Sequence, residues 1–189
     1  MNTSNYLGMK PGDLANKPYA KYWNPEMQPM QEHVQQSLLH GAEAAELSFP
    51  LEEADRLLQA GYLELENGYT RLANGQIFAA ILTKMPGVTG KMIDWWFGWH
   101  YLESQRYKLW HPRCHVNNGA KRMVSDDPNL SDKEKYLNNP LNKLIPAKWL
   151  AKLAGSLDLG RDMVVHCGME MNHLASFLPA LYADYHKDM

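Results

Sequence analysis

The sequence is poor in cysteine, in net charge and in long apolar runs, and each shortage excludes a class of protein. Two cysteines, Cys114 and Cys167, among 189 residues cannot form the disulfide framework of a small secreted domain. Nineteen Lys and Arg against 21 Asp and Glu give a formal net charge of −2, which leaves no basic field for nucleic acid or an anionic membrane. The longest purely apolar run, residues 77–82, is far shorter than the roughly 20 residues of a membrane span. We therefore expect neither a nucleic-acid partner nor a membrane partner.

The composition is otherwise that of a folded domain, with 45% apolar and 21% charged residues. The first residues lack the basic and apolar segments of a secretory signal, so we expect a cytoplasmic location. We divide the chain into an N-terminal arm with helices, residues 1–60, and a single structural unit, residues 61–189.

The N-terminal part combines an extended arm with two helices. Four prolines within residues 1–30 predict an arm that lies over the surface. Residues 30–47 predict a helix. Residues 48–61 predict a second, in which Ser48 is the cap and Gly61 the end.

Two Asn-Gly dipeptides, at residues 67–68 and 74–75, separate three strand-like runs. Asn-Gly supplies the two positive φ angles of a type I′ turn, so residues 62–84 predict a three-stranded antiparallel meander. Beyond it the pattern predicts one helix over residues 91–107, a loop and a polar linker. A short helix over residues 146–155 and a long final helix starting near Asp158 complete the chain.

Four of the six tryptophans, Trp95, Trp96, Trp99 and Trp110, lie close together in the sequence. Packing of aromatic bulk onto the sheet explains any one of them. As a group they fit equally well the wall of a cavity for a flat, apolar ligand. Periodicity does not separate these two interpretations.

The pair His166 and Glu170 places two titratable groups on one face of an otherwise apolar helix, because residues four apart share a face. Either they satisfy each other or they hold a ligand. His115 lies on a loop after the aromatic helix, where functional side chains are often presented. Two imidazoles and a carboxylate form an open zinc site when they meet, although a loop histidine alone is more often a surface group. The spacing is not the H-E-x-x-H of zinc proteases.

Two long segments, "MIDWWFGWHYLESQRYKLWHPRCHV" (residues 92–116) and "DLGRDMVVHCGMEMNHLASFLPALYADY" (residues 158–185), closely resemble the 2,4-diacetylphloroglucinol hydrolase family, which includes phloretin hydrolase. The resemblance covers roughly residues 18–137 and 157–185. It implies a zinc-dependent hydrolase that cleaves the carbon–carbon bond between a phenolic ring and an acyl group. It also implies an α+β helix-grip fold, as in Bet v 1 and START domains, with a curved antiparallel sheet on a long C-terminal helix.

The resemblance assigns roles to five residues of this chain. The family's zinc ligands fall on His115, His166 and Glu170. Its substrate-binding tyrosine and asparagine fall on Tyr107 and Asn118, which would orient the phenolic oxygens of a phenolic ketone and stabilise charge developing there.

One departure from the family pattern concerns the segment after residue 139. The family's fourth zinc ligand, a glutamate, and several strands of the sheet are expected there, whereas this chain runs almost directly into its last helix. The nearest carboxylate, Glu134, fits a solvated helix residue better than a ligand. An incomplete sheet would leave apolar surface uncovered, which predicts reduced stability or a homo-oligomer.

Both cysteines and three further histidines lie near the proposed ligands in the sequence. A thiolate of Cys114 or Cys167 could replace the lost carboxylate, but buried, inert thiols are the favoured interpretation. His173 shares the face of His166 and Glu170 and fits a ligand or a partner of one. His100 and His111 are expected to be hydrogen-bonding residues.

Two function classes follow. The first is a zinc-dependent hydrolase of acylphloroglucinol-type substrates. The second is a shortened, catalytically impaired or inactive homologue that at most binds a hydrophobic aromatic ligand.

Overall fold

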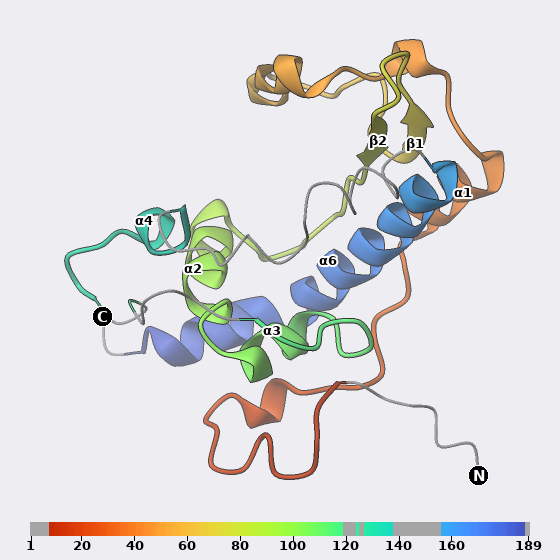
Figure 1. Ribbon diagram of the computed structural model, residues 1–189. Coiled ribbons are helices and arrows are strands. Elements are labelled where there is room, and N and C mark those ends of the chain that lie inside the picture. The colour runs from red at the N-terminus through yellow and green to blue at the C-terminus, as the bar shows by residue number, and fades with distance from the viewer. Residues whose placement is uncertain (1–7, 119–123, 125–126, 138–155, 188–189) are drawn as a thin grey trace, which may run out of the picture. The chain divides into compact units, whose positions relative to one another are not determined.

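The structure is a computed structural model that describes residues 8–118, 124, 127–137 and 156–187. Its contacts group the chain into two compact units. The first unit comprises Met1–Gln28, Met85–Asn142 and Glu170–Met189, and the second comprises Pro29–Lys84 and Lys143–Met169. One continuous helix, α6 (Leu157–Tyr185), contributes to both units (Figure 1). The predicted division at residue 60 stays a prediction.

Helices make up most of the first unit. They are η1 (Ala20–Tyr22), α2 (Gly90–His100), α3 (Ser104–Trp110), α4 (Asp132–Leu137) and the C-terminal part of α6 (Figure 1). The start of α2 is capped by Thr89, whose side-chain oxygen accepts a hydrogen bond from the Met92 backbone N–H at 3.3 Å. The final helix begins within one residue of its predicted start. The helix predicted over residues 146–155 lies outside the described residues.

The single helix predicted over residues 91–107 is wrong, because the chain breaks between α2 and α3. The carbonyl groups of the last turn of α2 find side-chain partners there. Arg106 donates to the Trp99 carbonyl oxygen at 3.1 Å, and His100 Nδ1 lies 2.8 Å from the Trp96 carbonyl oxygen. The Trp99 carbonyl is a group that a continuing helix would otherwise have bonded, so its bond to Arg106 lets α2 stop.

The N-terminal arm is not confined to the surface, contrary to its prediction. The Tyr19 side chain is 1% exposed and packs edge-on against Trp99, with ring centroids 5.3 Å apart. An ion pair between Lys108 Nζ and Asp13 Oδ2, 3.3 Å apart, fixes the arm to α3. The arm therefore contributes a large ring to the core and an anchor for α3.

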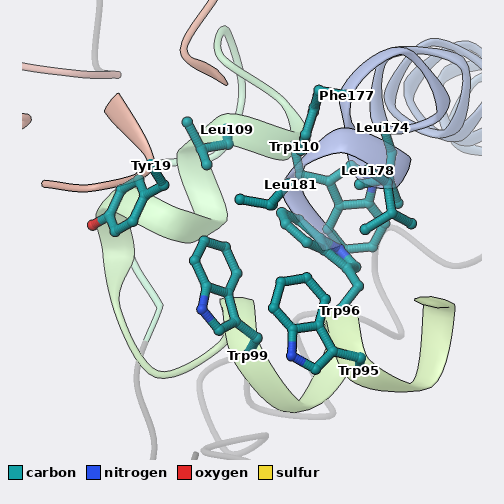
Figure 2. Close-up of a cluster of buried hydrophobic side chains, with 10 residues drawn as sticks. All are labelled: Tyr19, Trp95, Trp96, Trp99, Leu109, Trp110, Leu174, Phe177, Leu178 and Leu181. Carbon is teal, nitrogen blue, oxygen red and sulfur yellow. The ribbon is translucent and has the colours of Figure 1, made fainter. Parts of the chain in front are cut away.

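The four clustered tryptophans form the core of the first unit (Figure 2). Trp96 is fully buried, and Trp95 stacks on Trp99 with ring centroids 5.3 Å apart. The apolar face of α6 completes the cluster, whose other members are Tyr19, Leu109, Leu174, Phe177, Leu178 and Leu181. The tryptophans are thus packed core residues, as one interpretation held, but they pack on α6 and the arm rather than on the sheet.

The second unit holds α1 (Glu32–His40), η2 (Ala45–Leu47), η3 (Leu51–Leu58) and two strands. The helix predicted over residues 30–47 ends early, at Gly41, whose φ of 90° lies in the left-handed region that ends helices. The second predicted helix is instead the 3₁₀ segment η3. Ser48 does not cap it, because its hydroxyl donates to the Ala45 carbonyl oxygen at 2.7 Å.

The predicted three-stranded meander is wrong, because the sheet has two antiparallel strands, β1 (Gly68–Arg71) and β2 (Ile77–Ala80). The Leu63 N–H donates to the Glu66 carboxylate in a local turn, so the first run does not extend into a strand. The turn at residues 74–75 does join the strands. However, Gly75 alone of this dipeptide has a positive φ, of 86°, so the turn is not type I′.

Helix α6 packs closely against this sheet within the second unit. A Cβ on Gly160 would lie 2.9 Å from Ile77 Cγ2 and 3.0 Å from Tyr69 Cβ, so only glycine permits this approach. Val164, one turn further along, is fully buried with Tyr69 and Val34. The structure therefore has an antiparallel sheet on a long C-terminal helix, an α+β arrangement, and the helix-grip assignment stays a prediction. None of the described helices is both long and apolar enough to cross a membrane.

His100 generates a prediction about the pH dependence of stability. Burial lowers the pKa of His100 from 6.5 to about 4. The unfolded chain therefore takes up a proton that the folded chain refuses, and the stability that this site contributes above pH 6.5 is lost as the pH falls toward 4. Between pH 7 and pH 4.5 the loss attributable to this site is roughly 2 kcal/mol.

Urea unfolding followed by tryptophan fluorescence at both pH values measures this loss. The His100→Phe variant keeps an aromatic ring without a titrating group, so it should lose roughly 2 kcal/mol less than the parent chain. Equal losses in the two proteins would show that His100 is not held neutral.

Candidate metal centre

His115 is held by a tight turn that follows α3. Its backbone N–H donates to the His111 carbonyl oxygen at 2.9 Å. Its ring lies flat against the Tyr107 ring, with centroids 3.7 Å apart and planes inclined by 8°. The side chain is 5% exposed, and Nδ1 lies 3.0 Å from the Tyr107 carbonyl oxygen. Backbone and ring contacts together leave the imidazole little freedom.

The contact with the Tyr107 carbonyl determines the tautomer of His115. A carbonyl oxygen only accepts hydrogen bonds, so Nδ1 carries the proton. The other ring nitrogen, Nε2, lies 3.3 Å from Glu170 Oε2, and the Glu170 side chain is 9% exposed. A lone pair that faces a buried carboxylate oxygen requires a proton or a metal cation between the two atoms.

His166 precedes Glu170 by one turn of α6, and the helix itself fixes their separation. One ligand atom each from His115, His166 and Glu170 lie within 4.8 Å of one another. Two imidazole nitrogens and a carboxylate oxygen are a donor set that zinc accepts, with a position left for a further ligand. The three predicted ligands are thus brought together, and the residues present fit the ion.

Cys114 does not match its prediction as a buried thiol, because it is exposed, whereas Cys167 is half-buried. Partial desolvation and the Glu170 carboxylate raise the pKa of the Cys114 thiol, so it stays protonated at neutral pH. Ligand atoms of Cys114, His111 and His166 also lie within 4.8 Å of one another. His111 is a hydrogen-bonding residue as predicted, since its Nδ1 accepts from the Cys114 N–H at 3.2 Å.

The two predicted substrate-binding residues lie on either side of His115 in the sequence. Tyr107 is half-buried, and burial with the Glu170 charge raises its pKa, so the phenol stays protonated. Asn118 is half-buried at the end of the same loop, and its backbone N–H donates to Ser104 Oγ at 3.0 Å. Ser104, which the sequence reasoning missed, therefore ties the Asn118 loop to α3, the helix that carries Tyr107.

Glu134 is a solvated helix residue, as predicted. Its N–H donates to Ser131 Oγ at 3.3 Å and its carboxylate accepts from the Ser131 N–H at 2.8 Å, which is a capping box at the start of α4. The carboxylate also accepts from the Ser131 hydroxyl at 2.7 Å. These hydrogen bonds lower its pKa. His173 is 1% exposed, its Nδ1 accepts from the Gln28 N–H at 3.3 Å, and neither ligand group includes it. The Gln28 contact was not predicted, because nothing in the sequence pairs residues this far apart.

A groove of about 1050 Å³ lies in the second unit and shares no residue with this cluster. Its apolar lining includes Phe49, Leu57, Leu65, Ile77 and Met163. Among its described lining residues there is neither histidine nor cysteine. The His115 cluster is therefore the better candidate for a metal-dependent site.

Comparisons with known proteins agree with the sequence resemblance. The sequence model of the family described as "DAPG hydrolase PhiG domain" matches residues 49–143. A 2,4-diacetylphloroglucinol hydrolase from Pseudomonas sp is 36% identical over 131 residues, covering 67% of this chain and 44% of the relative. The enzyme of the same name from Pseudomonas protegens is also 36% identical over 131 residues, covering 67% of this chain and 42% of the relative.

A third relative is the phloretin hydrolase of Eubacterium ramulus, 37% identical over 99 residues, which cover 51% of this chain and 36% of the relative. The chain thus spans less than half the length of each of these relatives.

The geometry of the cluster predicts which residues retain a divalent metal. His166→Ala and Glu170→Gln should each weaken metal binding by at least about 100-fold, because an open three-ligand site rarely survives the loss of one arm. Glu134→Gln, the control for loss of a carboxylate, should bind metal as the parent chain does. Zinc content after dialysis and competition with a chromophoric chelator measure both effects. Stoichiometric zinc in His166→Ala would contradict the ligand assignment.

Proposed function

The chain belongs to the DAPG hydrolase family, and from this membership we propose that it takes part in zinc-dependent hydrolysis of the carbon–carbon bond between a phenolic ring and an acyl group. The proposed substrates are acylphloroglucinol-type phenolic ketones, in line with the names of the relatives. The single observation that best supports a catalytic role is the cluster of buried His115, half-buried His166 and buried Glu170. We further propose a cytoplasmic location, which suits a chain with two free cysteines.

Hydrolysis of an aryl ketone requires the aromatic ring to accept an electron pair. The bond between the ring carbon and the acyl carbon breaks, its electrons stay on the ring carbon, and that carbon gains a proton. Water supplies the hydroxyl that turns the acyl group into a carboxylic acid. The ring reaches this point most easily as a keto tautomer, in which a phenolic oxygen has become a carbonyl that can hold the charge.

The residues around His115 suit the needs of this reaction. Zinc, held by His115, His166 and Glu170, would supply Lewis acidity toward oxygen ligands and lower the pKa of water toward ~7. Tyr107 keeps its proton, because burial and Glu170 raise its pKa, so its hydroxyl can donate a hydrogen bond to a phenolic oxygen as charge develops. Asn118 offers an amide for the same purpose from a loop anchored at Ser104.

The alternative, an impaired homologue, is favoured by the position of Glu134. Neither ligand group in the described part of the chain contains a second carboxylate, and Glu134 is exposed and bonded to Ser131. Three protein ligands are enough for a catalytic zinc site, so this loss need not abolish the reaction. Correct placement of the substrate's keto tautomer requires contacts with more residues than metal binding does. We therefore propose a weakened rather than an absent activity.

Turnover of 2,4-diacetylphloroglucinol and phloretin tests the proposal. Release of the free acid, followed by chromatography, should require zinc and should be at least about 100-fold slower than with the longer Pseudomonas relatives, because small errors in positioning cost orders of magnitude. Inserting the glutamate-bearing segment of such a relative should raise the rate sharply.

A matched variant checks that the activity belongs to this site. Tyr107→Phe should lower kcat by a further ~100-fold while leaving zinc content unchanged, because the ring and the backbone carbonyl that hold His115 remain. A rate equal to that of the longer relatives would contradict the proposed impairment. Full activity of Tyr107→Phe would contradict the role of the phenol.

A further inference from the structure

Four aromatic rings of the first unit form a continuous stack that ends at His115. Trp96 stacks on His100, with ring centroids 4.9 Å apart and planes inclined by 16°. His100 stacks on Tyr107 at 5.8 Å and 24°, and Tyr107 stacks on His115 at 3.7 Å and 8°. The stack therefore runs from the centre of the core to the imidazole that faces Glu170.

We propose that His100 is a positioning residue, which sets the direction of His115 Nε2 by stacking against the ring of Tyr107. This role goes beyond the proposed hydrolase function, although its use to the protein rests on His115 being a metal ligand. Sequence reasoning gave His100 no role other than hydrogen bonding.

His100 and Trp96, the two rings of the stack furthest from His115, are held by several contacts. His100 is 3% exposed, and its Nδ1 lies 2.8 Å from the Trp96 carbonyl oxygen in the last turn of α2. Trp96 is fully buried and is also in contact with Trp99 and Phe177. Burial lowers the pKa of His100 to about 4, so the ring is neutral and places no charge near a cation.

The rings of Trp110 and His111 border the His115 ring, with centroids 5.5 Å away, but two closer contacts come from Tyr107. Its ring stacks on the imidazole, and its carbonyl oxygen binds Nδ1. If the Tyr107 ring tilts, the stacked imidazole tilts with it, and Nε2 moves away from Glu170 Oε2. Partners that orient a metal-binding histidine typically change metal affinity by about 10–100-fold when they are lost.

The chain contains a matched control for this arrangement. Nδ1 of His186 lies 2.7 Å from the carbonyl oxygen of Tyr182, which precedes it by four residues. The two rings stack with their centroids 3.8 Å apart. His100 makes the same pair of contacts with Trp96. Both histidines lie near the C-terminal end of a helix, but His186 packs against Trp95 and Tyr182 rather than against Tyr107, so only its local contacts are comparable.

The first test uses the metal-free protein labelled with ¹⁵N-histidine. NMR should show His115 as the Nδ1–H tautomer, with a proton that exchanges slowly with solvent. His100→Leu fills similar volume without a planar ring, and it should accelerate this exchange at least about 10-fold. His100→Phe restores a stacking ring and should stay within about twofold of the parent chain, as should His186→Leu.

The second test determines whether His100 acts on His115 through Tyr107. Tyr107→Leu should accelerate exchange at His115 as much as His100→Leu does, and the double variant should show no further increase, because both changes remove the same support. Zinc affinity should fall by about 10-fold in His100→Leu and recover in His100→Phe.

The outcomes separate this inference from the proposed function. Unchanged exchange at His115 in His100→Leu, an equal effect in His186→Leu, or additive effects in the double variant would each overturn the positioning role. If the parent chain binds no zinc, the proposed function fails, yet the exchange measurements still decide the role of His100.

Discussion

The proton on His115 Nδ1 is the constraint on which the rest of the site depends. Because this proton is donated to the Tyr107 carbonyl oxygen, the lone pair of the imidazole lies on Nε2 and faces the Glu170 carboxylate. With the opposite tautomer, a hydrogen bond would join Nε2 and the carboxylate and would leave nothing for a cation to bind. The arrangement of donors, rather than the presence of two histidines and a glutamate, makes the cluster suitable for a metal.

Four features of the surrounding fold keep this arrangement in place. The tryptophan core packs against α3 through Leu109 and Trp110, and the ion pair of Lys108 with Asp13 fixes that helix to the N-terminal arm. The bond of Ser104 to the Asn118 backbone closes the loop on the other side of His115. Helix α6 brings His166 and Glu170 one turn apart on one face. Each of these supports is a buried or half-buried contact, which suits a site that must not rearrange when a cation binds.

The sequence allowed α6 and the grouping of His115, His166 and Glu170 to be predicted, because a helical period and a long specific motif are both local signals, whereas their role as metal ligands stays a prediction. The breaks were not predictable in the same way. The end of α2 depends on Arg106 reaching back to the Trp99 carbonyl, and the missing strand depends on Glu66 capturing the Leu63 N–H. Both are competitions between a side chain and regular structure that periodicity does not weigh. The burial of Tyr19 also escaped prediction, since prolines indicate an extended chain but not what the chain covers.

The most direct test of the account is X-ray absorption spectroscopy of the zinc-loaded chain. The account predicts a first shell of nitrogen and oxygen at about 2.0–2.1 Å, with the outer-shell scattering of two imidazoles. Cys114, whose sulfur lies in a second group that shares His166, makes the opposite result specific. Sulfur at about 2.3 Å, or a shell with a single imidazole, would contradict a centre built from His115, His166 and Glu170.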